Sequence, residues 1–96
     1  MVLLRERYHS PYGEVDLVMR EGDVLVFVEV KTRARGIAGD GLCAITPVKQ
    51  IRLLKTASMY LAEMGENPLV RFDVMEITPE GVVHVRSAFD ETGVAW

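Results

Sequence analysis

Four charged side chains in the first third of the chain have the types and spacing to do hydrolytic chemistry together. Glu14 and Asp16 stand two residues apart in one alternating segment, and Glu29 and Lys31 do so in the next. Residues two apart on a strand point to the same face. Three converging carboxylates would repel one another unless a cation lay between them. Carboxylates and a carbonyl, here that of Val30, suit Mg²⁺ or Mn²⁺.

With such a cation in place, the cluster would have the parts of a phosphodiester hydrolase. The metal would lower the pKa of a water molecule and screen the charge of the phosphate. Lys31, on the same face, would orient that water or stabilise an oxyanion. Spacing alone leaves an alternative open, in which Lys31 forms an exposed cross-strand ion pair with Glu14 or Glu29.

A β-hairpin must position these side chains. Alternating and β-branched residues predict strands over 2–9, 14–20 and 24–32, with Glu21-Gly22 as a tight turn between the second and third. That turn would place Glu14 opposite Glu29, with Asp16 as a diagonal neighbour about 7–8 Å away. A register change of one residue would scatter the cluster over both faces of the sheet.

A single helix is predicted after the hairpin. Thr46 is a suitable N-cap, Pro47 fits the first helical position and Gly65 fits a left-handed C-terminal residue. Apolar spacing predicts a buried stripe made of Ile51, Leu54, Ala57, Ser58, Leu61 and Met64.

Two more strands, over 69–77 and 82–86, complete the order βββαββ, with a turn over 78–81. A strand, helix and strand in succession make a right-handed parallel crossover, so strands 24–32 and 69–77 should be parallel. We expect one α/β domain over residues 1–96, with a mixed central sheet.

The composition is that of a globular protein, with 49% hydrophobic and 26% charged residues. Without a signal peptide or an apolar run long enough for a membrane, and with the single cysteine Cys43, the chain is expected to be cytoplasmic. His9 and His84 lack metal-ligand spacing and are expected at the surface or on an edge strand.

Charge is strongly segregated along the chain. Residues 31–55 carry six basic side chains and one acid, while the whole chain has a net charge of −3. Such a segment indicates a face that binds a polyanion such as DNA, and a solvated helix and loop is the alternative. The candidate phosphate contacts are Arg5, Arg7, Arg33, Arg35, Lys49 and Arg52.

Four segments in order resemble the YraN-type family of small bacterial proteins. They are Gly13-Glu14-Val15-Asp16-Leu17-Val18, Val26-Phe27-Val28-Glu29-Val30-Lys31-Thr32-Arg33, Thr46-Pro47-Val48-Lys49-Gln50 and Arg71-Phe72-Asp73-Val74. That family is similar to archaeal Holliday-junction resolvases, in the PD-(D/E)xK nuclease superfamily.

The resemblance implies a restriction-endonuclease-like fold and a metal-dependent endonuclease acting on DNA, including branched or single-stranded DNA. It implies that Asp16 and Glu29 are metal ligands, that Lys31 is the catalytic lysine, and that Gln50 has an accessory role, as does Glu14. Family members usually begin with a helix that carries a further glutamate. This chain starts at the first strand, so either the true start lies upstream or this is a shortened member whose metal site lacks a ligand. Glu6, which lies within the first strand, does not replace that glutamate.

Assembly and activity each have an alternative. One face of strand 24–32 has no helix in this chain to cover it, which predicts a homodimer, unless the first strand or a loop covers that face. The rival to an endonuclease is a non-catalytic module that binds nucleic acid or protein on a nuclease scaffold.

Overall fold

The computed structural model describes residues 1–32, 46–65 and 67–89. It contains five strands and one helix in the predicted order βββαββ. The elements are β1 (Val2–Ser10), β2 (Gly13–Glu21), β3 (Val24–Thr32), α1 (Pro47–Met64), β4 (Leu69–Thr78) and β5 (Gly81–Phe89).

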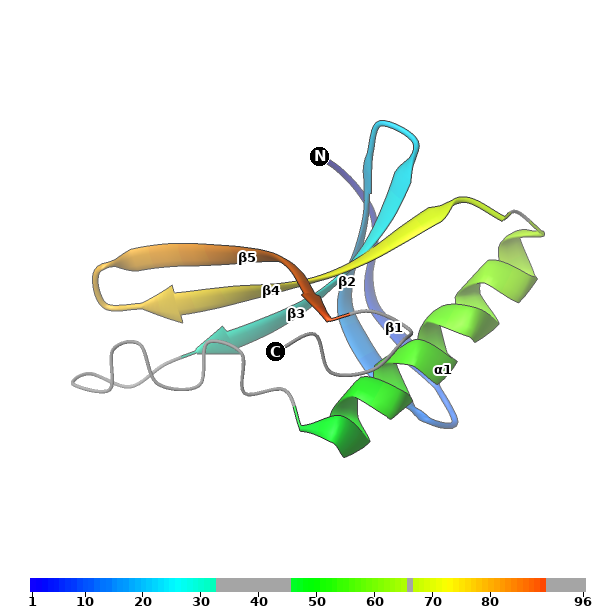
Figure 1. The fold of residues 1–96 in the computed structure, drawn as a ribbon, viewed down its shortest axis with the longest axis horizontal. Helices are drawn as coiled ribbons and strands as arrows, with labels where there is room; N and C mark the ends of the chain where they lie inside the picture. Colours follow the sequence, from blue (N-terminus) through cyan, green and yellow to red (C-terminus); the bar gives the residue numbers. More distant parts are fainter. Residues whose placement is uncertain (33–45, 66, 90–96) are drawn as a thin grey trace.

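The strands form one mixed sheet in the spatial order β1-β2-β3-β4-β5. All neighbours are antiparallel except β3 and β4, which confirms the predicted parallel crossover. Figure 1 shows α1 lying along one side of the sheet beside β1 and β2, while the β4–β5 hairpin extends away from the helix. No helix within the described residues is long and apolar enough to cross a membrane.

The helix begins and ends at the predicted residues. The Thr46 hydroxyl accepts the Lys49 N–H at 3.2 Å, and Gly65, at φ 71°, donates its N–H to the Leu61 carbonyl at 3.0 Å. The predicted buried stripe was partly wrong, because Ile51 is 52% exposed and Ser58 is also exposed. The buried face is rotated toward Gln50, Leu53, Thr56, Ala57 and Tyr60.

The core lies between this helical face and the sheet. Its aromatic centre joins β1, β3, α1 and β4: the Tyr60 ring meets the Tyr8 ring edge-on at 5.1 Å and the Phe27 ring at 5.9 Å. Phe27 in turn stacks on Phe72 at 5.6 Å. Such ring pairs add to the stability gained from burial alone and fix the helix against β3.

The hairpin turn differs from the prediction. Glu21 pairs with Val24, so the turn is Gly22-Asp23 and not Glu21-Gly22. Gly22 has φ 60°, a conformation that a two-residue hairpin turn requires at its first position and that glycine adopts without strain. The shift from the predicted pairing is two residues, an even number, so every side chain keeps its predicted face.

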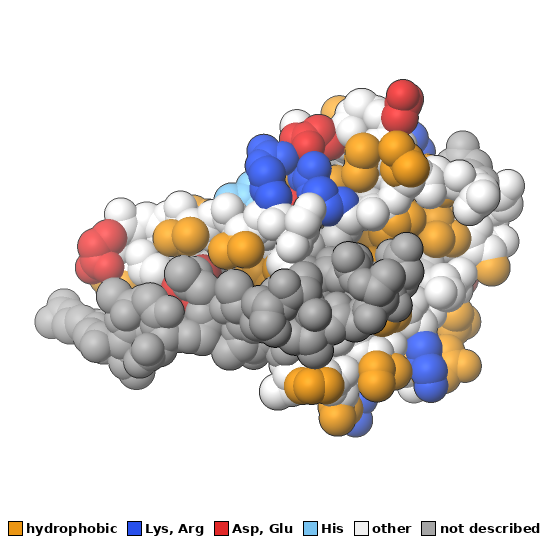
Figure 2. Space-filling model, in the orientation of Figure 1, with side chains coloured by type: hydrophobic (Ala, Val, Ile, Leu, Met, Phe, Trp, Pro, Cys, Tyr) orange, Lys and Arg blue, Asp and Glu red, His pale blue; other side chains and the backbone are white. Residues whose placement is uncertain are grey.

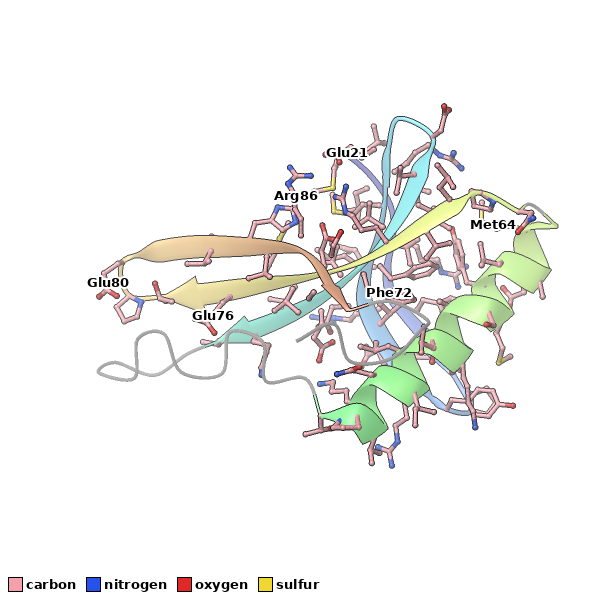
Figure 3. The ribbon with its side chains drawn as sticks, viewed as in Figure 1. Glu21, Met64, Phe72, Glu76, Glu80 and Arg86 are labelled. Atoms are coloured by element: carbon pink, nitrogen blue, oxygen red, sulfur yellow. The ribbon has the colours of Figure 1, made fainter. Side chains whose placement is uncertain are left out.

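The opposite face of the sheet carries an ion-pair network. Arg71 of β4 donates to both oxygens of the fully buried Asp73, at 2.8 and 2.9 Å, and to Glu21 of β2 at 2.8 Å. Arg86 of β5 also binds Glu21, and His84 lies 2.7 Å from Asp73. Glu21 and Arg86 are labelled in Figure 3, and Figure 2 shows basic side chains gathered in the same area.

The predicted homodimer rested on this face being uncovered. Val26 and Val28 of β3 point to it and are fully buried within the single chain. Their partners on β4 are Arg71 and Asp73, so the network shares the face with them. The homodimer stays a prediction that sedimentation equilibrium can test.

Candidate active site

The candidate site lies where β2 and β3 separate. Regular pairing between the two strands ends at Leu17 and Val28. Beyond that point the Asp16 carboxylate, and not a backbone carbonyl, accepts the Val30 N–H, at 2.7 Å. A short hydrogen bond from the backbone to a carboxylate fixes the side chain in place. The local break in the ladder therefore holds Asp16 against the end of β3.

Glu29 is the second carboxylate of the site and is 5% exposed. It points to the helical face of the sheet, where its carboxylate is paired with the Lys49 ammonium of α1. Burial raises the pKa of the Glu29 carboxyl above its usual range, and the adjacent Asp16 carboxyl raises it further by hydrogen bonding and charge, whereas Lys49 acts to lower it. The site thus holds two neighbouring carboxyl groups, and their proximity disfavours the ionisation of both at once.

Lys31 lies two residues beyond Glu29 on the same face of β3. Its register partner on β4 is Glu76, which is 2% exposed. Figure 3 labels Glu76 on β4 beside the end of β3. The sequence reasoning missed this residue. The available signal was an acid inside a strand predicted to pair with strand 24–32, where an ionised side chain is rarely buried without a functional or ionic partner.

Glu14 has a partner outside the predicted cluster. Its carboxylate faces His9 across the β1–β2 pair, at 3.5 Å, and its side chain is 40% exposed. Among the residues that the structure describes, no three acidic, histidine or cysteine side chains group closely enough to hold a metal. Asp16 and Glu29 are therefore the closest pair of the predicted cluster, and Glu14 lines the same cavity.

A cavity of about 390 Å³ opens over the two carboxylates. Its walls come from β2, β3 and the first turns of α1, and they include Glu14, Asp16, Glu29, Lys49 and Arg52. Acidic groups thus form one wall and basic groups of the helix the other. An anionic ligand in this cavity would be attracted by the basic wall and repelled by the acidic one.

Of the remaining candidate residues, three lie in the described part of the chain and two lie outside it. Arg5 is exposed on β1 with its guanidinium 5.2 Å from the Tyr8 ring. Arg7 is also exposed and lines a separate pocket with Asp16. Gln50 is 4% exposed, in the helical turn that holds Lys49. Arg33 and Arg35 lie outside the described residues.

Comparison with known proteins identifies the family. Residues 1–77 match the model of the uncharacterised protein family UPF0102. A UPF0102 protein of Nitrosomonas eutropha is 39% identical over 92 residues, which cover 95% of this chain and 79% of the relative. A UPF0102 protein of Nitrosococcus oceani is 42% identical over 93 residues, with 91% and 75% covered. The chain therefore belongs to the UPF0102 family.

Proposed function

We propose that this member of the UPF0102 family is a metal-dependent endonuclease that cleaves DNA, with branched DNA such as Holliday junctions as its preferred substrate. The observation that carries the proposal is the meeting of Asp16 and Glu29 where β2 and β3 separate. A hairpin needs no pair of carboxylates in contact for its stability, because like charges in contact oppose folding. Their close approach favours a role in binding a cation.

The donor set fits Mg²⁺ or Mn²⁺. Mg²⁺ is commonly held by one or two carboxylates, with water and substrate phosphate completing its ligands. Asp16 and Glu29 would hold the ion, with the Val30 carbonyl as a further oxygen donor, and the ion would displace the Lys49 ammonium from Glu29. When bound, the ion would supply an activated water and neutralise charge on the phosphate.

The protein's own side chains would position the substrate. Lys31 follows Glu29 on the same face and would donate hydrogen bonds to the attacking water or to the phosphate oxygen that gains charge. Arg52, on the basic wall of the cavity, would bind a neighbouring phosphate. Asp16 cannot move freely, because the Val30 N–H holds one of its oxygens.

The preference for branched DNA rests on the resemblance to junction resolvases and on the kind of side chain at the cavity. Its basic residues are Lys49 and Arg52, which as phosphate-binding groups would carry little sequence information. We expect recognition by shape and charge. DNA affinity should fall steeply with salt, by roughly 0.9 in log–log slope for each phosphate contact.

The test is cleavage of end-labelled DNA. Wild-type protein should cut a four-way junction in Mn²⁺ or Mg²⁺ and not in EDTA, and it should cut the matched linear duplex more slowly. Asp16→Asn and Glu29→Gln should abolish cleavage while the circular dichroism spectrum stays unchanged. Asp23→Asn, which alters an exposed acid in the hairpin turn, is the matched control and should cut normally.

One observation favours a second candidate. The Lys49 ammonium compensates the charge of the Glu29 carboxylate without a metal ion. A non-catalytic module that binds nucleic acid would need no other cation at this position. Junction binding by folded protein without cleavage in either metal ion would support that module and contradict the endonuclease.

A further inference from the structure

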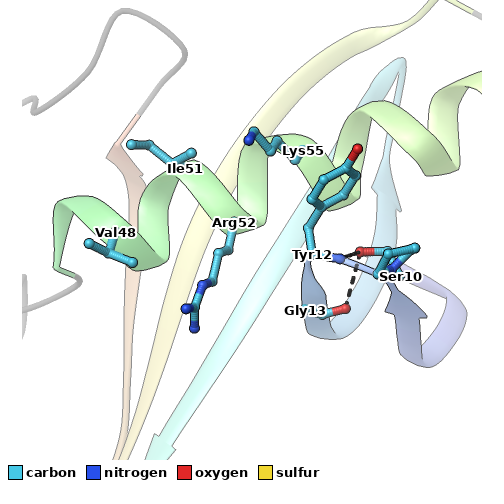
Figure 4. A pocket seen from close by; sticks show the side chains of 8 residues that line it. Ser10, Tyr12, Gly13, Val48, Ile51, Arg52 and Lys55 are labelled. Carbon is cyan, nitrogen blue, oxygen red and sulfur yellow. Dashed lines mark hydrogen bonds between the residues drawn. The ribbon is translucent and has the colours of Figure 1, made fainter.

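A second, more open pocket lies directly beside the candidate active site. It has a volume of about 600 Å³ and is formed by the β1–β2 turn and the first half of α1 (Figure 4). The side chains of Tyr12, Val48, Ile51, Arg52 and Lys55 line it. The proposed cleavage chemistry uses none of the apolar and aromatic groups in this pocket, so their exposure needs another explanation.

The two pockets adjoin each other, and together they are called the groove. Gly13, Val48 and Arg52 line both of them. Arg52 therefore lies between the carboxylate pair and the tyrosine, and a strand with a phosphate on Arg52 would extend toward both. Gly13, at φ 149°, comes close to the helix at this point, where a Cβ would lie 3.8 Å from the Arg52 Cβ.

Tyr12 is held in an exposed position by the turn that carries it. The Ser10 hydroxyl accepts the Tyr12 N–H at 3.0 Å and is bonded at 2.8 Å to the hydroxyl of Thr56, a fully buried residue of α1. The turn is thereby fixed to the helix. Tyr12 itself is 46% exposed, so a fixed backbone presents its ring to solvent.

The groups around the ring suit a nucleotide whose base is not paired. The Lys55 ammonium lies 5.2 Å from the centre of the Tyr12 ring, and Val48 and Ile51 are 59% and 52% exposed. An aromatic face and aliphatic side chains can hold a flat base, while Lys55 and Arg52 can bind the phosphates on either side. Paired bases of a duplex are already stacked and cannot reach such a ring.

We propose that the Tyr12 pocket is a subsite for an unpaired nucleotide next to the phosphate that is cut. The inference rests on the proposed function, and it narrows the substrate class to DNA that offers a single-stranded segment beside the cleavage point, such as an open junction or a flap. Tyr12 acts as a binding residue and takes no part in bond breaking. Sequence preference in this subsite should be weak, since every base has a face that stacks.

Fluorescence anisotropy in EDTA tests the subsite without cleavage. The probes are a labelled single strand and a blunt duplex of the same sequence. Tyr12→Ala should weaken single-strand binding about tenfold and leave duplex binding unchanged, because one stacked base is lost. Tyr12→Phe keeps the ring and should bind as wild type. Val82→Ala, which shortens another exposed apolar side chain outside the groove, is the matched control.

The outcomes separate this inference from the nuclease proposal. Unchanged single-strand binding by folded Tyr12→Ala, or an equal loss for strand and duplex, overturns the subsite, while metal-dependent cleavage that Asp16→Asn abolishes still supports the nuclease. If wild-type protein binds neither probe and cuts no DNA in Mn²⁺, both proposals fail. Photocrosslinking of a 5-iododeoxyuridine strand to the peptide that contains Tyr12 would support the subsite directly.

Discussion

The Asp16 carboxylate accepts the Val30 N–H at 2.7 Å, so a side chain takes the place of a backbone partner at the point where β2 and β3 separate. This contact has two consequences. It ends the regular ladder, which leaves room for a cavity between the strands and α1, and it fixes one proposed metal ligand to the strand that carries the other.

Two substitutions at Asp16 separate its structural and chemical roles. Asp16→Asn keeps an oxygen that can accept the Val30 N–H, so its free energy of unfolding should stay close to that of the wild type. Asp16→Ala removes the acceptor and should cost about 1–2 kcal/mol. Both variants should lose metal-dependent cleavage. Urea denaturation and a cleavage assay check the two roles, and an active Asp16→Asn would contradict the assignment.

Lys49 should compete with a metal ion for Glu29. The Lys49→Met variant removes that ammonium, and Mn²⁺ should then bind roughly two- to fivefold more tightly, the range expected for losing a partly exposed ion pair. Isothermal titration calorimetry measures the affinity. Lys55→Met, which changes a lysine that lies over Tyr12, is the control and should bind Mn²⁺ as wild type does. Weaker Mn²⁺ binding by Lys49→Met would contradict competition.

The network on the opposite face should contribute to stability. Arg71→Met leaves the buried Asp73 carboxylate without its bidentate partner and should lower the free energy of unfolding by about 3 kcal/mol. Arg86→Met removes a more exposed partner of Glu21 and should cost clearly less, because water screens exposed ion pairs. Urea unfolding curves compare the two variants. Equal losses in the free energy of unfolding would contradict the claim that the burial of Asp73 makes its ion pair the stronger one.

The same network predicts sensitivity to acid. Hydrogen bonds from Arg71 and Arg86 lower the pKa of the Glu21 carboxyl from 4.5 to about 2. Burial acts to raise the pKa of Asp73, but hydrogen bonds from Arg71, the Ser87 N–H and His84 outweigh it, and the net shift is downward. A carboxyl whose pKa is lower in the folded state stabilises the fold above its unfolded pKa and loses that contribution as the pH falls.

Stability should therefore decline as the pH falls from about 4.5 toward 2. The Glu21→Gln variant has no carboxyl at this position to protonate. Its free energy of unfolding should be lower than that of wild type at neutral pH and should fall less as the pH is lowered. Urea midpoints measured across this interval test the sign. If the difference in urea midpoint between the two proteins grew toward low pH, the predicted sign would be contradicted.

The features that local chemistry controls could be predicted from the sequence. Thr46, Pro47 and Gly65 determine the ends of the helix, and the succession of strand, helix and strand leads to the parallel pairing of β3 and β4. The sequence also placed Asp16 and Glu29 on one face, because an error of two residues in the turn preserves the alternation of faces.

Contacts between distant segments could not be predicted in the same way. The sequence did not reveal that Lys49 pairs with Glu29, or that His84, which lies on the edge strand β5 as expected, reaches the buried Asp73. The exposure of Ile51 depends on how α1 is rotated against the sheet. That rotation is set by the packing of Tyr60 and Leu53, which periodicity alone does not reveal.

Single-turnover cleavage of a labelled four-way junction in Mn²⁺, by wild type and Lys31→Ala, tests the central claim most directly. If Lys31 stabilises charge that develops on the phosphate, Lys31→Ala should bind Mn²⁺ and the junction as wild type does and cleave it about 100-fold more slowly. Absence of cleavage by folded wild-type protein that binds the junction, or cleavage by Lys31→Ala at the wild-type rate, would contradict the account.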